Sequence, residues 1–119
     1  MKYMLLIHQG DAPTPRAPEA WARLSEGEQK AVYADYRAVS EAPGVTPGAE
    51  MQDPESATTV RVQGGETLVT DGPFVAVKEA LGGYLFYEAE DLDAAISLAA
   101  GIPAARLGGA VEIRPIVER

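Results

Sequence analysis

At 119 residues, the chain is long enough for one domain over residues 1–119 and short enough to gain stability from dimerisation. Its net charge of −8 argues against nucleic-acid and membrane partners, because phosphates and anionic headgroups would be repelled. The sequence has no cysteine and one histidine, which excludes disulfides, thiolate metal sites and a multi-histidine metal site within one chain. Metal binding by carboxylates alone is left open, but no spacing of acidic residues supports it, and we expect neither a metal nor a cofactor.

The start of the chain predicts a buried β-strand over residues 3–9. Alternate residues of a strand face opposite sides, which puts Leu5 and Ile7 on one face and Leu6 and His8 on the other. Because both faces are apolar, both must be covered, and we expect a second copy of the chain to cover one of them. The apolar run is far too short to cross a membrane and lacks a small-residue cleavage site, so we predict a cytoplasmic protein.

A loop over residues 10–18 is followed by a helix whose start is marked by a capping box. Ser25 is the expected cap, and Glu28 is spaced to reach back to it. Pro43 and Gly44 should end the helix near Ala42. The apolar stripe of this helix is Val32, Tyr33, Tyr36 and Val39.

Proline and glycine dominate the next segment. Residues 45–56 contain Pro47, Gly48 and Pro54, and are expected to form a loop that tolerates substitution. A β-hairpin of residues 57–62 and 66–70 is predicted about Gly64-Gly65, since glycine accepts positive φ at both turn positions. We expect its strands to join the sheet of the first strand, so that Asp71 and His8 can reach one cleft.

The hairpin ends in the sequence Asp71-Gly72-Pro73. Gly72 and Pro73 are predicted structural turn residues, because proline removes a backbone donor and glycine adopts unusual dihedral angles. The carboxylate of Asp71 is then left at a strand end, where functional sites are often built. We expect Gly72→Val to be more harmful than Gly48→Val.

The C-terminal half predicts a strand, a helix and a strand. The first strand covers residues 82–89, and the helix begins at Asp91, whose side chain can cap it. Residues 110–117 form the last strand, in which Pro115 indicates a sheet edge or a strand end. The apolar stripe of the helix is Leu92, Ala95, Ile96 and Ala99.

This order of elements indicates an α+β domain, a ferredoxin-like βαββαβ arrangement with an extra hairpin strand. The sequence also resembles the YCII-related proteins of the DGPF-domain branch, whose central motif appears here as Asp71-Gly72-Pro73-Phe74. The resemblance covers nearly the whole chain. The other stretches that carry it are residues 2–7, 58–62, 78–79, 81–84, 91–95, 102–105 and 111–115.

The resemblance implies a dimeric α+β barrel, in which the helix-free sheet faces of two subunits pack together. It also implies a His–Asp pair in a cleft, which has been proposed for family members, most of which have no established substrate. His8 and Asp71 are the positions that could carry this pair and act as catalytic residues. Arg114 and Tyr84 are candidate substrate-binding residues.

Each candidate residue also has a structural interpretation. A lone histidine near a strand end often serves as a hydrogen-bonding group, and an aspartate before Gly-Pro often forms a turn. Glu112 and Arg114 are expected to form a surface or interface ion pair. Tyr33 and Tyr36 are assigned to the core, and Lys78-Glu79 to a solvated connection.

Three hypotheses for function remain open. The first is a cofactor-free enzyme in which His8 transfers a proton and Asp71 orients it, as in a lyase, isomerase or hydrolase step. The alternative is a non-catalytic ligand-binding or regulatory dimer, since family members are often encoded near extracytoplasmic-function sigma factors. The third is a homodimer without a small-molecule ligand.

Overall fold

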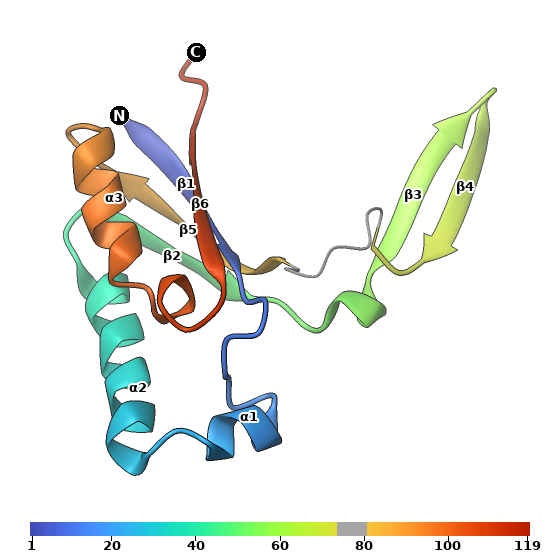
Figure 1. Ribbon diagram of the computed structural model, residues 1–119. Helices are drawn as coiled ribbons and strands as arrows, with labels where there is room; N and C mark the ends of the chain where they lie inside the picture. Colours follow the sequence, from blue (N-terminus) through green and yellow to red (C-terminus); the bar gives the residue numbers. More distant parts are fainter. Residues whose placement is uncertain (74–80) are drawn as a thin grey trace.

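The computed structural model describes residues 1–73 and 81–119, and Phe74, Lys78 and Glu79 of the predicted motif lie outside them. Figure 1 shows a sheet with helices on one side and a separate hairpin. The strands are β1 (Lys2–His8), β2 (Val45–Glu50), β3 (Thr58–Gln63), β4 (Glu66–Asp71), β5 (Leu81–Glu88) and β6 (Ala110–Pro115). The helices are α1 (Pro18–Ala22), α2 (Glu26–Glu41) and α3 (Leu92–Ala100), with 3-10 turns η1 (Pro54–Ser56) and η2 (Pro103–Ala105).

The main sheet is antiparallel and has the strand order β2-β5-β1-β6. Strand β1 is central, so that Leu5 lies opposite Leu85 of β5 and opposite Ile113 of β6. Strands β3 and β4 are not part of this sheet, so β2, β5 and β6 are its second, third and fourth strands in chain order. The observed order is then consistent with the predicted ferredoxin-like α+β arrangement. Within the described ranges, no helix is both long and apolar enough to cross a membrane.

Strand β2, the second strand in chain order, forms where the sequence predicted a loop. Pro47 and Gly48 are typical loop residues, but β2 lies at the sheet edge and pairs with β5 alone among the described strands. An edge strand tolerates proline because the missing N–H need not serve a second neighbour. The predicted loop over residues 45–56 is therefore wrong in its first half.

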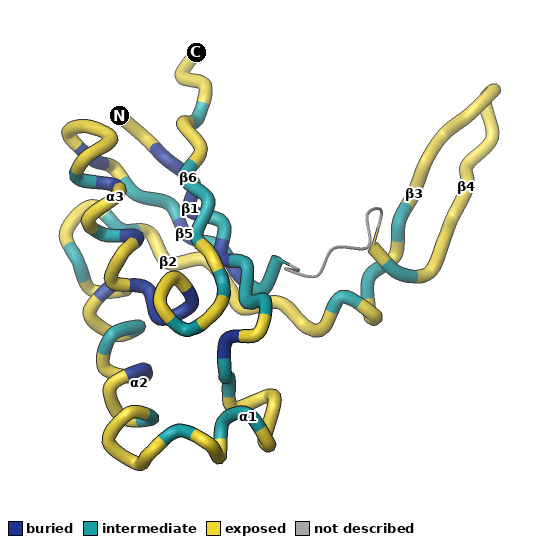
Figure 2. Tube along the Cα trace, viewed as in Figure 1, coloured by how far each residue is buried: buried dark blue, intermediate teal, exposed yellow. Residues whose placement is uncertain are grey.

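Strands β3 and β4 form the predicted hairpin, but in a two-stranded sheet of their own. Gly64 and Gly65 have φ of 57° and 81°, and Val60 lies opposite Val69 as the turn predicts. The ribbon projects from the main sheet in Figure 1 and is exposed almost throughout in Figure 2. The expectation that the hairpin strands join the sheet of β1 is wrong.

Both long helices begin at the predicted caps. The Ser25 side chain accepts from the Glu28 N–H at 3.1 Å, and the Glu28 carboxylate accepts from the Ser25 N–H at 2.9 Å. Asp91 accepts from the Ala94 N–H at 2.9 Å. These bonds satisfy amides that have no partner within the first turn of a helix. The C-cap of α2 is Ala42, also as predicted.

The core lies between the helices and one face of the sheet. Leu5 is 0% exposed and stands at its centre. The buried cluster consists of Tyr3, Leu5, Ile7, Val39, Leu85, Ala89, Ala95, Ala99, Ile102 and Ala104. Tyr36 packs against it as predicted.

Three residues assigned to apolar stripes lie outside the core. Tyr33 is 55% exposed and packs edge to face against Trp21, with ring centroids 5.5 Å apart. Leu92 and Ile96 of α3 are also about half exposed. Helix α3 contacts the core through Ala95 and Ala99. The face that packs therefore leaves out the larger apolar residues of the predicted stripe.

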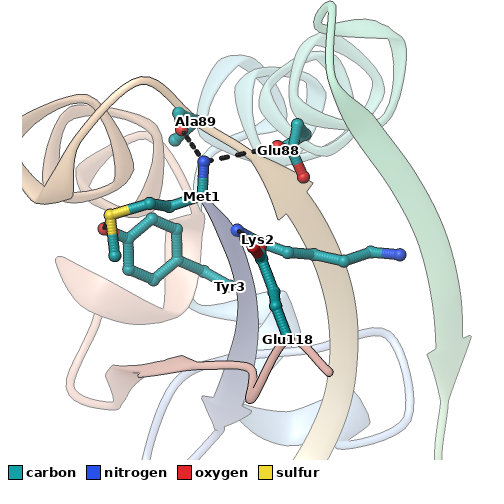
Figure 3. A network of polar contacts seen from close by, with 6 residues as sticks. All are labelled: Met1, Lys2, Tyr3, Glu88, Ala89 and Glu118. Carbon is teal, nitrogen blue, oxygen red and sulfur yellow. Dashed lines mark hydrogen bonds and ion pairs between the residues drawn. The ribbon is translucent and has the colours of Figure 1, made fainter.

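The first residues are held by polar contacts at one end of the sheet (Figure 3). The Met1 ammonium donates to the Ala89 carbonyl at 2.8 Å and contacts the Glu88 carboxylate at 3.3 Å. The Lys2 N–H donates to Glu118 Oε1 at 3.2 Å. These contacts hold β1 beside β5 and β6, and His8 lies at the opposite end of the strand.

Candidate functional site

His8 is the last residue of β1 and lies on the sheet face opposite the core. Its neighbour Ile7 is buried with the core, and alternation turns His8 to the other side. The His8 side chain is 25% exposed, and its Nε2 lies 3.2 Å from Glu112 Oε1. The carboxylate that contacts the histidine thus comes from β6, the neighbouring strand.

Glu112 joins His8 to Arg114. Glu112 lies opposite Leu6 and Arg114 lies opposite Met4, so both share the sheet face of His8. Arg114 donates through Nη2 to the second carboxylate oxygen of Glu112, which confirms the predicted ion pair. Hydrogen bonding from Arg114, followed by that from His8, lowers the pKa of Glu112. An ionised Glu112 accepts hydrogen bonds only, so the contact is a hydrogen bond in the His8 tautomer that has its N–H at Nε2.

Apolar side chains continue the face beside this polar row. Met4 lies opposite Phe86, and Leu6 lies opposite Tyr84. The Tyr84 and Phe86 rings pack edge to face with centroids 6.1 Å apart. Met4, Leu6, Tyr84 and Phe86 are all partly exposed, and α2 and α3 lie on the other side of the sheet (Figure 1). The face therefore combines a His–Glu–Arg row with an apolar surface, and the predicted substrate-binding residues Tyr84 and Arg114 both lie on it.

Asp71 occupies a different part of the fold. It ends β4, is exposed and lies opposite Thr58 of β3. The neighbours of β1 are β5 and β6, so the predicted adjacency of the His8 and Asp71 strands is wrong. Within residues 1–73 and 81–119, the Asp71 carboxylate forms neither a hydrogen bond nor an ion pair.

Gly72 and Pro73 follow the hairpin as predicted turn residues. Gly72 has φ of +100°, a conformation that favours glycine. Its N–H donates to the Ala57 carbonyl at 2.7 Å, and its own carbonyl accepts from the Thr59 hydroxyl at 2.7 Å. These bonds close the base of the ribbon and give Gly72 a structural role.

A cavity of about 350 Å³ lies on the core side of the sheet. Helix α2 contributes Tyr33 and Tyr36 to its walls, β1 and β5 contribute Ile7 and Leu85, and Glu50 of β2 also lines it. The sequence does not predict this cavity, because the residues of β2 have the composition of a loop. The alternating apolar residues Val45, Pro47 and Ala49 are typical of a strand, but Pro47 and Gly48 are also typical of a loop.

Glu112 was likewise missed as the partner of His8. The signal existed, because the last strand of a ferredoxin-like sheet lies beside the first. Alternation in β6 then places Glu112 and Arg114 on one face. Among the described residues, no three acidic or histidine side chains gather closely enough to hold a metal ion.

The four-stranded antiparallel sheet, with α2 and α3 on one face and a histidine–carboxylate contact on the other, defines a small α+β domain in which no described helix covers the second sheet face. The family model of the YCII-related domain matches residues 1–119, and the chain belongs to this family. It is 33% identical over 121 residues to an uncharacterized protein of Rhizobium meliloti (strain 1021), an alignment that covers 98% of this chain and 92% of that protein.

Proposed function

We propose that this YCII-related protein is a cofactor-free enzyme that uses His8 to transfer a proton to or from a small molecule. The contact of 3.2 Å between His8 Nε2 and Glu112 Oε1 carries the proposal. A carboxylate beside an imidazole fixes its orientation and stabilises the imidazolium that forms when it accepts a proton. Arg114 keeps Glu112 ionised for this role, and His8 is partly exposed and so accessible to a ligand.

The reaction classes that fit are proton-transfer steps of a lyase, isomerase or hydrolase. Tyr84 and the neighbouring apolar side chains would contact the body of the substrate. Asp71 remains a predicted functional residue whose contribution must be measured separately from that of Glu112. The central motif of the family resemblance supports Asp71, whereas the sheet register supports Glu112.

A turnover screen tests this proposal. Small lactones, enol esters and oxo acids are incubated with the protein and followed by proton NMR. We expect turnover that falls by at least about 100-fold in His8→Gln, the range expected for general acid–base catalysis, and by a smaller factor in Glu112→Gln. Asp71→Asn in the same assay measures the competing assignment. Turnover that survives His8→Gln would show that the proposal is wrong.

We also propose that the uncovered sheet face packs against the same face of a second copy, forming a dimeric α+β barrel. Met4, Leu6, Tyr84 and Phe86 give this face an apolar surface, and none of the helices that the structure describes lies over it. A two-fold interface of this kind should bury at least ~1,500 Å² in total. His8 would then border a dimer cleft that excludes bulk water.

Light scattering of the chain at micromolar concentration tests the dimer. Leu6→Glu should give a monomer, since it puts a charge on the uncovered face. Leu92→Glu is the matched control, because Leu92 is 50% exposed on α3 and should leave the dimer intact. A monomeric wild-type chain would contradict the proposed assembly.

A non-catalytic ligand-binding or regulatory dimer is the second candidate. The cavity of about 350 Å³ favours it, because this volume suits a small molecule and His8 does not line the cavity. Ligands that raise the melting temperature but are never turned over would support this candidate over the enzyme.

A further inference from the structure

The cavity on the core side of the sheet has the construction of a ligand site. Five segments line it: α2, the strands β1 and β5, the edge strand β2, and the loop before α1. Its volume of about 350 Å³ falls within the range of small-molecule sites. Ile7 lines it, whereas His8 faces the opposite side of β1, so the cavity is separate from the His8–Glu112 contact.

The walls of the cavity are held in place. Ile7, Val32 and Leu85 are buried, and the ring of Trp21 supports Tyr33 from outside. Gln29 of α2 donates through Nε2 to the Trp21 carbonyl at 2.9 Å, which ties α1 to α2. This part of the wall is formed before any ligand arrives, which lowers the ordering cost of binding, whereas Glu50 and its neighbours in β2 are exposed.

The lining is apolar and aromatic, with one charge. Tyr33 and Tyr36 contribute rings and hydroxyl groups, and Ser40 and Thr14 add hydroxyl groups. Of the described residues that line the cavity, Glu50 alone is charged. A bound anion would have no cation to pair with among them, whereas a bound ammonium could pair with Glu50 and contact the tyrosine rings.

One cation, Arg16, is next in sequence to a lining residue, but it is held by acceptors outside the lining. Arg16 follows the lining residue Pro15 and donates through Nη1 to the Met51 carbonyl at 3.1 Å. Its Nη2 lies 4.0 Å from Asp53 Oδ1. Glu50, Arg16 and Asp53 together carry a net negative charge, which favours a cationic ligand.

We propose that this cavity binds a small aromatic amine, with the ring between α2 and the sheet and the ammonium group paired with Glu50. The proposal does not depend on catalysis by His8, since His8 is not among the residues that line the cavity. It assigns the α2 side of the sheet a ligand of defined charge and shape.

Calorimetric titration with matched probes tests the charge preference. The probes are benzylamine, 2-phenylethylamine and 4-phenylbutylamine, with 3-phenylpropanoate as the anion and 2-phenylethanol as the neutral compound. We expect at least one amine to bind at least about tenfold more tightly than the anion and the alcohol. The amine should also change the emission of Trp21, the single tryptophan of the chain, because its ring packs on the cavity wall.

Variants locate the binding site. Glu50→Gln should reduce the affinity for the amine about five- to tenfold and leave the affinity for the alcohol unchanged. Glu41→Gln is the matched control, since Glu41 ends α2 outside the cavity lining and should leave both affinities as they were. Ala49→Phe should block all the probes by filling the cavity.

Three outcomes would overturn the proposal: no amine binds at millimolar concentration, the anion binds as tightly as the amines, or Glu50→Gln leaves amine affinity unchanged.

His8→Gln should not alter amine binding. A loss of turnover in that variant with amine binding retained would therefore separate the two sites.

Discussion

The Nε2 atom of His8 and the Oε1 atom of Glu112 lie 3.2 Å apart on neighbouring strands that come from opposite ends of the chain. The contact exists because β1 and β6 pair in antiparallel register. Arg114 engages the other oxygen of Glu112. One carboxylate thus serves two basic partners on the uncovered sheet face.

The contacts of Glu112 predict which of its two partners has the larger effect on its pKa. Glu112 has a pKa below its usual value of 4.5, chiefly through Arg114 and next through His8. A lowered carboxyl pKa gives stability that is present above the usual value and is lost as the pH falls through the lowered one. We expect Arg114→Met to raise the pKa of Glu112 more than His8→Gln does, as measured by NMR of its carboxyl carbon.

Glu28 is the internal control for this titration. Hydrogen bonds from Ser25 lower its pKa, and neither Arg114 nor His8 takes part in them. The Glu28 carboxyl should therefore titrate identically in both variants. A larger shift of Glu112 in His8→Gln than in Arg114→Met would contradict the assigned order of causes.

The start of α2 depends on the Ser25 hydroxyl. Ser25→Ala removes the acceptor for the Glu28 N–H and should lower the free energy of unfolding by about 1 kcal/mol. The pKa of Glu28 should rise in the same variant. Ser97→Ala is the control, since Ser97 is exposed within α3, where alanine is a good helix former. Urea unfolding should show a loss in the first variant only.

Gly48 should tolerate substitution less well than Gly72. A Cβ atom at Gly48 would overlap the Tyr84 backbone carbonyl and lie 2.6 Å from carbons of the Tyr84 ring, whereas a Cβ at Gly72 meets no atom of the described residues within 4 Å. Gly48→Val should cost at least about 3 kcal/mol through overpacking. Gly72→Val should cost about 1–2 kcal/mol through its positive φ alone. Thermal unfolding checks the order, which is the reverse of the sequence-based expectation.

Leu5 and Leu92 form a matched pair for the core. Leu5 is 0% exposed, and Leu92 is 50% exposed on α3. Leu5→Ala should destabilise the protein by about 2–5 kcal/mol through lost burial and a residual cavity. Leu92→Ala should cost less than about 1 kcal/mol. Equal losses would mean that α3 packs through the stripe predicted from apolarity.

Local signals in the sequence predicted local structure well. The Ser25–Glu28 capping box, the Asp91 cap and the Gly64-Gly65 turn depend on residues close in the chain, and all three form as expected. Strand β2 was missed because Pro47 and Gly48 usually break strands. Its pairing with β5 is a tertiary effect that overrides this preference.

The candidate site was predicted only in part, for a related reason. His8 and Arg114 were singled out, and both lie on the uncovered face. Which carboxylate approaches His8 depends on which strands are neighbours, and that choice is non-local. The motif drew attention to Asp71, while the register of β1 and β6 brings Glu112 to the histidine.

Among the described strands, β3 and β4 form backbone hydrogen bonds only with each other. Val60, Val62 and Val69 of this ribbon are all more than half exposed. An isolated two-stranded ribbon is only marginally stable in water. Its amide protons should therefore exchange with deuterium through local opening, while those of β1 and β5 exchange only when the whole sheet unfolds. In a mild denaturant the ribbon amides should keep their exchange rates as those of the sheet rise, so that one short chain contains two cooperative units.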